Sequence, residues 1–240
     1  MSSFLGRLDE VTERIAAAAR RSGRSETDVT LIPVTKNVEV ARIAEAVKAD
    51  LTRFGENRVQ EAMAKAPLLP PSVEWHLVGT LQRNKARHAV GLFSMVHSLD
   101  RVELASELAR RCAARGVSLD VLVQVNMGRE SQKSGVMPEG TRELLEALTR
   151  YQTLRVRGLM IMTPLCDDPE SVRPLFREGR ILKEELGRLR LSNVELEHLS
   201  MGMSGDFEVA IEEGATMVRI GTALFGPRPV ATLDAEEASD

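Results

Sequence analysis

Residues 29–57 read VTLIPVTKNVEVARIAEAVKADLTRFGEN, and this stretch holds one complete repeating unit of the fold. It opens with an apolar run, continues through a segment with helical spacing, and returns to a second short run that ends in FGEN. The first run is apolar on both faces, which is typical of a strand buried between a core and a layer of helices. The stretch therefore predicts two parallel strands joined by a crossover helix.

The same alternation continues along the rest of the chain. Helices are expected over residues 5–20, 38–49, 58–65, 84–90, 102–115, 139–150, 170–189 and 206–213. Between them lie eight short runs, which are VTLIPVTK, LTRFGEN, VEWHLVG, MVHSLD, LDVLVQVN, RVRGLMIMT, VELEHLSMG and MVRIGTALFG.

Eight strand–helix units within 240 residues predict an α/β fold, a single-domain (β/α)8 TIM-type barrel. We expect the barrel to occupy residues 1–229 and an acidic, disordered tail to occupy residues 230–240. An open doubly wound sheet is the alternative, but no GxGxxG motif follows the first strand. Pro33 removes a ladder donor from that strand, so a β-bulge is expected there.

Composition narrows the class of protein. The net charge of −3 and the 3% content of aromatic residues disfavour a nucleic-acid-binding surface. No run of about 18 apolar residues predicts a membrane span, and the N-terminus lacks the apolar segment of a secretory signal. Cys112 and Cys166 are far apart and outside any CxxC pair, so we expect a reducing cytoplasm and no metal cluster.

Two cations stand out at the predicted strand ends, where barrels place their active sites. Lys36 ends the first strand, whereas Lys48, Lys65 and Lys183 lie in polar helical contexts and are interpreted as solvated. Lys36 is either a solvated strand end or an amine activated toward a carbonyl by desolvation and a nearby cation. Arg219 lies between apolar neighbours and stays protonated, so it needs an acceptor, either from a structural ion pair or from a ligand.

The last two predicted strands end in loops rich in serine and glycine. Ser200 and Ser204 offer hydroxyls, and Ser204 is expected to cap the helix that starts at Asp206. Gly221 allows close approach of backbone to a ligand, and Thr222 adds a hydroxyl and an amide. Ordinary capping is one interpretation of these loops and a phosphate site is the other. These three features match the three parts of pyridoxal 5′-phosphate. The lysine can bond to its aldehyde, the arginine can face its ring nitrogen, and the loops can bind its phosphate.

The chain also resembles a known family. It is similar to the YggS/PROSC family of pyridoxal phosphate homeostasis proteins, and through it to the barrel domain of alanine racemases. The motifs that carry the resemblance are VTKN at 34–37, FGENRVQEA at 54–62, WHLVGTLQRNK at 75–85, VHSLDR at 96–101, QVNMGRESQKSG at 124–135, GLMIM at 158–162, LSMGMSGD at 199–206 and VRIGTALFG at 218–226.

The resemblance implies roles for individual residues. Lys36 would hold the cofactor as an internal aldimine, and Arg219 would face its pyridine nitrogen. The other implied cofactor residues are Ser200, Ser204, Gly221 and Thr222 for the phosphate and Asn57 and Met201 for the ring. Lys133 matches a family loop lysine implicated in cofactor transfer, and a solvated loop lysine is the alternative. Asn37 and Arg58 depart from the residues common in the family.

A racemase needs an acid/base group on each face of its planar intermediate. The one tyrosine, Tyr151, is expected at the opposite end of the barrel, and His198 is interpreted as a core histidine. We therefore expect a monomeric carrier without catalytic residues. It would bind pyridoxal 5′-phosphate and other B6 vitamers as candidate ligands, and deliver cofactor through transient contact with apo-enzymes. A racemase or related amino acid enzyme is the first alternative, and a cofactor-free aldolase-like barrel that forms a Schiff base is the second.

Overall fold

The computed structural model describes residues 3–227, and within them eight parallel strands form one sheet in the order β1-β8-β7-β6-β5-β4-β3-β2. The strands are β1 (Thr30–Pro33), β2 (Arg53–Glu56), β3 (Glu74–Leu77), β4 (Met95–Leu99), β5 (Leu119–Asn126), β6 (Leu154–Met162), β7 (Val194–Ser200) and β8 (Met217–Ile220). A parallel bridge between Val34 and Gly55 joins the two outer strands β1 and β2. The amide of Thr35 also donates to the carbonyl of Gly55 at 2.8 Å. The sheet closes on itself, so the predicted single-domain barrel is confirmed.

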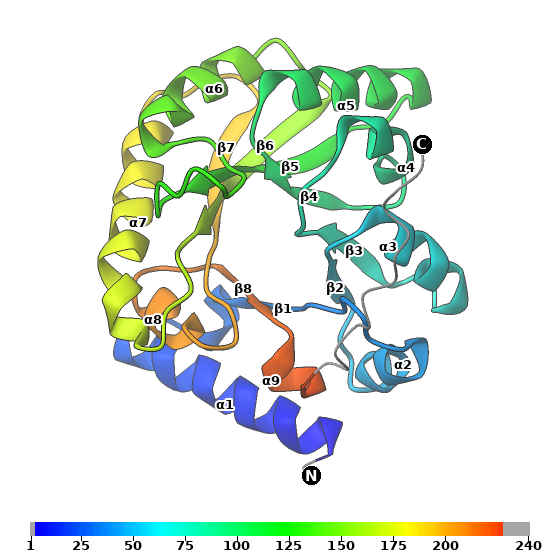
Figure 1. Ribbon diagram of the computed structural model, residues 1–240, viewed down its shortest axis with the longest axis vertical. Helices are drawn as coiled ribbons and strands as arrows, with labels where there is room; N and C mark the ends of the chain where they lie inside the picture. The colour runs from blue at the N-terminus through cyan, green and yellow to red at the C-terminus, as the bar shows by residue number, and fades with distance from the viewer. Residues whose placement is uncertain (1–2, 228–240) are drawn as a thin grey trace.

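Helices form a ring outside the strands, and β1 lies beside β8 although the two are far apart in the sequence (Figure 1). The α-helices are α1 (Phe4–Arg21), α2 (Val40–Lys48), α3 (Val59–Lys65), α4 (Ala86–Ala89), α5 (Val102–Arg115), α6 (Thr141–Leu148), α7 (Arg173–Gly187), α8 (Phe207–Glu212) and α9 (Thr222–Phe225). Short 3₁₀ turns occupy Glu26–Asp28, Ala66–Leu68, Arg83–Lys85, Pro138–Gly140 and Pro169–Val172. The predicted barrel end at residue 229 and the predicted tail over 230–240 lie outside the described residues.

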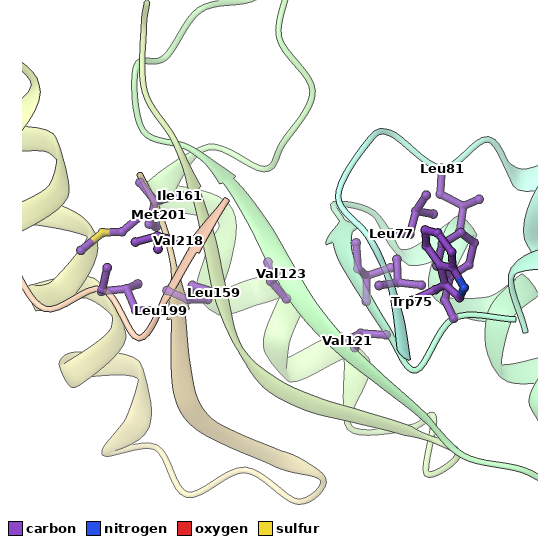
Figure 2. Close-up of a cluster of buried hydrophobic side chains, with 14 of the residues drawn as sticks. Trp75, Leu77, Leu81, Val121, Val123, Leu159, Ile161, Leu199, Met201 and Val218 are labelled. Carbon is purple, nitrogen blue, oxygen red and sulfur yellow. The ribbon is translucent and has the colours of Figure 1, made fainter. Parts of the chain in front are cut away.

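Apolar side chains fill two separate layers. Most pack between the strands and the helices, and Figure 2 shows part of this layer on β3, β5, β6, β7 and β8. The second layer is a small cluster inside the barrel, formed by Ile32, Met95, Leu122, Met160 and Met217. Since strand residues alternate between the two faces, the same strands supply both layers. The interior cluster shares the inside of the barrel with the polar groups described below.

Pro33 does not produce the bulge that the sequence predicts. The β1–β8 register runs without interruption from Thr30 to Pro33, so that expectation is wrong. Thr30 donates its amide to Thr216, the residue before β8, and Val34 donates to Ile220 of β8, whereas Thr35 donates to β2. By this alternation the nitrogen of Pro33 faces β2, where regular pairing is absent. The missing donor therefore leaves every β1–β8 hydrogen bond in place.

The neighbouring strands β1 and β8 end earlier than the sequence predicts. β1 ends at Pro33, so Lys36 lies in the turn beyond the strand and not at its last position. β8 ends at Ile220, and the residues that follow Gly221 form the short helix α9 instead of more strand. Among the described residues, no helix combines the length and apolarity that a bilayer span requires.

Candidate functional site

A cavity of about 360 Å³ opens at the carboxyl ends of the strands, and we call it the carboxyl-end cavity. Its walls come from β6 and β8 and from the segments that follow β1, β2, β3, β6, β7 and β8. The lining residues are Val34, Asn57, Val78, Met160, Met162, Leu165, Cys166, Met203, Ser204, Gly205, Asp206, Arg219, Gly221 and Thr222. Its position is the one at which barrels of this kind bind ligands.

Arg219 is the main charge inside this cavity. It is 5% exposed, and its guanidinium donates to Ser200 Oγ at 2.8 Å and to the carbonyl of Ile161 at 3.3 Å. Burial lowers the pKa of Arg219 to about 10, and the Asp206 carboxylate opposes this shift. Arg219 remains a cation at neutral pH, and no carboxylate among residues 3–227 forms an ion pair with it. A buried cation in this state favours a ligand that brings an acceptor.

The loops after β7 and β8 lie against each other at one wall of the cavity. Ser204 Oγ accepts the amide of Ala223 in α9 at 3.3 Å. Asp206, and not Ser204, occupies the N-cap position of α8, so the predicted capping role of Ser204 is wrong. A Cβ at Gly202, where φ is +90°, would lie 2.7 Å from Ala210 Cβ. Glycine is therefore required for the β7 loop to pack this closely on α8.

Lys36 lies in the turn that leaves β1, two residues after the cavity-lining Val34. Its side chain is partly buried and makes no hydrogen bond or ion pair with another residue in the described range 3–227. Hydrogen bonds to two carboxylates hold the residues on both sides of Lys36 in place. Thr35 Oγ1 donates to Glu56 Oε1 at 2.8 Å, and the amide of Asn37 donates to Glu61 Oε2 at 3.0 Å.

Lys65 connects these two anchoring carboxylates. Its ammonium donates to Glu56 Oε1 at 2.5 Å, to the carbonyl of Thr35 at 2.7 Å and to Glu61 Oε2 at 3.1 Å. Lys65 is 8% exposed and Glu56 is fully buried. The prediction that Lys65 is solvated is therefore wrong. We call Lys65, Glu56 and Glu61 the ionic cluster, and it fixes the turn that presents the Lys36 amine.

Three predicted site residues, Lys36, Ser200 and Met201, are not among the residues that line the cavity. Ser200 is fully buried, and its hydroxyl contacts Arg219 and His97 instead of lining the cavity. Met201 is fully buried, and its side chain packs with Leu199 and Val218 in the outer apolar layer (Figure 2). The other predicted cofactor residues Asn57, Ser204, Arg219, Gly221 and Thr222 all line the cavity.

Sequence reasoning missed several lining residues. Met160 and Met162 alternate along β6, and only the closed register shows that they face inward. Cys166 and Leu165 lie in the loop after β6, and Leu165 is 85% exposed at the rim. No motif marks them. The two cysteines of the described residues, Cys112 and Cys166, are free, and no cluster of histidine, cysteine or carboxylate side chains there could hold a metal ion.

The structure shows where the three residues lie that were considered as acid/base or transfer groups. Tyr151 precedes β6 and lies at the opposite end of the barrel from the cavity. His198 is not a core residue, because it lines a second cavity of about 230 Å³ at that opposite end. Lys133 is tethered in the loop after β5, where its ammonium pairs with Glu130 Oε2 at 2.5 Å.

Comparison with known proteins places this geometry in a family. Residues 7–229 match the model of the alanine racemase N-terminal domain. A pyridoxal phosphate homeostasis protein of Aquifex aeolicus is 48% identical over 223 residues, which cover 92% of this chain and 97% of that protein. This chain belongs to the family of pyridoxal phosphate homeostasis proteins. The resemblance drawn from the sequence is thus confirmed.

Solved structures similar to this chain cover most of its length. PipY of Synechococcus elongatus, solved with pyridoxal phosphate bound, is 40% identical with a TM-score of 0.78 and covers 90% of this chain and 100% of its own. The crystal structure of an unknown protein from Bifidobacterium adolescentis is 32% identical with a TM-score of 0.88, over 92% of this chain and 94% of its own.

Proposed function

We propose that this chain binds pyridoxal 5′-phosphate in the carboxyl-end cavity, linked to Lys36 as an aldimine, and delivers the cofactor to apo-enzymes. The observation that carries the proposal is the buried cation Arg219, which faces the cavity without a carboxylate partner among residues 3–227. A pyridine nitrogen is an acceptor that a guanidinium can satisfy. The family relationship and the pyridoxal phosphate bound to PipY support the same ligand.

The residues fit the three parts of the cofactor. Ser204, Gly221 and Thr222 lie on two adjacent loops where a phosphate can accept hydroxyl and amide donors. Asn57 and the cavity methionines offer a surface for the ring. When bound, pyridoxal phosphate supplies a reactive aldehyde, and Lys36 supplies an unpaired amine toward it.

A carrier function is favoured over racemisation by the position of the acid/base groups. Tyr151 and His198 both lie at the end of the barrel opposite the cavity. Arg219 would donate a hydrogen bond to the ring nitrogen of a bound cofactor without protonating it, which would leave the ring a weaker electron sink. We infer a role in holding the cofactor covalently and releasing it, and other B6 vitamers that carry the phosphate are further candidate ligands.

The test is cofactor transfer. Loaded protein is mixed with an apo-enzyme that requires pyridoxal phosphate, and the regain of activity is compared with that produced by the same concentration of free cofactor. Lys36→Ala is expected to lose the visible aldimine absorption band, while Lys48→Ala on α2 retains it. Transfer from the wild type and none from Lys36→Ala supports the carrier. A colourless wild type that takes up no added cofactor would refute the binding proposal, and rapid racemisation of single L-amino acids would refute the carrier role.

A further inference from the structure

A row of hydrogen-bonded polar side chains crosses the barrel interior below Arg219. Ser200 Oγ lies 3.1 Å from His97 Nδ1, and His97 Nε2 lies 3.0 Å from His76 Nδ1. Arg219 donates to the same Ser200 hydroxyl at 2.8 Å. We call Arg219, Ser200, His97 and His76 the interior network. Its four members come from β8, β7, β4 and β3, so only the closed barrel brings them together.

The network is buried along its full length. Ser200 and His97 are fully buried, and His76 is 4% exposed. Arg219 lines the carboxyl-end cavity, whereas His76 lines the second cavity at the amino ends of the strands. The interior network therefore extends from one cavity to the other. Burial of this many polar groups is costly unless each one is paired, so the pairing pattern is informative.

Both histidines are neutral in the folded barrel. Burial lowers the pKa of His97 well below its ordinary value, and the charges of His76, Arg219 and His198 act in the same direction. Burial also lowers the pKa of His76 to about 4. A neutral imidazole carries one N–H and one acceptor nitrogen. Each ring must therefore accept at one end and donate at the other.

The permanent charge of Arg219 fixes the direction of every hydrogen bond in the network. Arginine only donates, so Ser200 Oγ accepts from it. The buried hydroxyl proton of Ser200 then has one recorded acceptor among the described residues, which is His97 Nδ1. His97 must carry its proton on Nε2, and it donates that proton to His76 Nδ1. His76 in turn keeps its proton on its own Nε2.

We propose that His97, supported by His76, is a positioning residue that holds Ser200 and Arg219 in one orientation at the carboxyl-end cavity. Ser200 fixes one terminal nitrogen of the guanidinium, and the carbonyl of Ile161 fixes the other. The second nitrogen also contacts Met162 Sδ at 3.7 Å, which leaves the Nε proton and one Nη1 proton of Arg219 available to a ligand. His97 acts by accepting the hydroxyl proton of Ser200, because a hydroxyl free to rotate would hold the guanidinium less well.

This assignment gives Ser200 a purpose that differs from phosphate binding. Its hydroxyl is engaged on both sides within the interior network and is not presented to the cavity. The part of the inference that concerns a bound ring rests on the proposed function. The part that concerns the histidine tautomers and the order of Arg219 does not, since it describes the protein without ligand.

The experiment begins with ligand-free protein. Imidazole ¹⁵N chemical shifts are expected to show both His97 and His76 protonated on Nε2. His97→Leu removes the acceptor of Ser200, and the guanidinium protons of Arg219 are expected to exchange with water about tenfold faster, the scale of one lost hydrogen bond. His97→Asn places an amide oxygen near the position of Nδ1 and is expected to restore slow exchange. His198→Leu is the matched control, because it removes a histidine of β7 that lines the second cavity and lies outside the network.

The second readout uses protein loaded with pyridoxal phosphate. His97→Leu is expected to shift the cofactor absorption band and accelerate its release, whereas His97→Asn and His198→Leu behave like the wild type. A His97 protonated on Nδ1 would overturn the proposal, as would unchanged exchange of the Arg219 protons in His97→Leu. If His97→Leu does not fold, the tautomers of the wild type and the exchange rates in His97→Asn still decide the question. Failure to bind cofactor with the ligand-free result intact would refute the proposed function alone.

Discussion

Gly79 shows how closely single residues control the shape of the cavity. It follows β3, and a Cβ at this position would lie 2.2 Å from the carbonyl oxygen of Asn57, a cavity-lining residue. The obstructing atoms are backbone, so the loop after β2 must shift. Gly79→Ala is expected to cost about 1–3 kcal/mol of unfolding free energy, as overpacking does, and to weaken cofactor retention. Denaturant unfolding measures the loss of stability, and dialysis of loaded protein measures the loss of cofactor retention.

The control for Gly79 is a glycine with open space around it. Gly187 ends α7, and a Cβ there meets no atom within 4 Å. Gly187→Ala is expected to leave stability unchanged or raise it by about 0.5–1 kcal/mol, because alanine restricts the unfolded chain. Equal stability of Gly79→Ala and the wild type would show that the two loops are not in tight contact.

Individual residues differ in how well the sequence predicted them. Arg219 was predicted to be buried because its neighbours in the strand are apolar, and the structure confirms this. Lys65 looked solvated because its helix is polar, although it meets a buried carboxylate from another element. Ser200 looked like a phosphate ligand because of its place beside a glycine-rich loop. A sequence shows only the local environment of a residue, whereas the partners of Lys65 and Ser200 come from distant strands.

At the scale of elements, the turn between β1 and α2 depends on α3. The ammonium of Lys65 bonds to the carbonyl of Thr35 and to Glu56, which is fully buried. Lys65→Met leaves the Glu56 carboxylate without its cation and is expected to cost about 3–5 kcal/mol of unfolding free energy. It is also expected to slow the appearance of the aldimine band after cofactor is added, because the turn that carries Lys36 loses its anchor.

Lys48→Met is the matched control for this prediction. Lys48 is the last residue of α2 and forms no ion pair with another described residue, so its replacement is expected to change stability by at most about 0.5 kcal/mol. In Lys65→Met, replacing Glu56 by Gln as well is expected to recover part of the lost stability. Equal rates of band formation in Lys65→Met and the wild type would separate the ionic cluster from the function of Lys36.

Most helices and strands were predictable from the sequence because apolar residues recur with a different period in helices and in strands. Seven of the eight strands lie within the apolar runs read from the sequence, β6 begins one residue before its run, and α5 has the predicted bounds Val102–Arg115. The largest errors lie at the carboxyl ends of β1 and β8. Apolar and small residues continue there past the last ladder pair, so the composition gives no sign that the strand has stopped. The residues that follow both strands line the cavity, where the backbone has left the sheet.

At the scale of the whole molecule, barrel closure unites residues that no local pattern connects. In the β3–β4 register His76 is opposite Met95. His97 therefore lies two residues further along β4, on the same face of the sheet as Met95. The sequence places His97 near the end of a predicted strand, but no local pattern indicates that it pairs with His76. Inward direction follows from period two, whereas contact across the barrel requires the register of all strands.

The two interior histidines make the stability of the whole barrel depend on pH. An unfolded histidine titrates near pH 6.5, whereas burial lowers the pKa of His76 to about 4 and that of His97 well below its ordinary value. Between these values the unfolded chain binds more protons than the folded chain, so stability rises with pH. The contribution is fully present above about pH 6.5 and is lost as the pH falls toward 4, by about 3 kcal/mol for His76.

Urea unfolding at pH 7, 6 and 5 measures this dependence, and His76→Asn isolates one histidine because its amide can still accept from His97. Other groups near His76, including Glu74, Arg53, Asp120 and His198, remain in the variant, so their contributions cancel in the comparison. The slope of stability against pH is expected to fall by up to about 1.4 kcal/mol per pH unit below pH 6. His88→Asn, on α4 outside the barrel interior, is expected to keep the slope of the wild type. If His76→Asn also kept it, the histidines would already be protonated in the folded barrel, and the direction assigned to the interior network would be wrong.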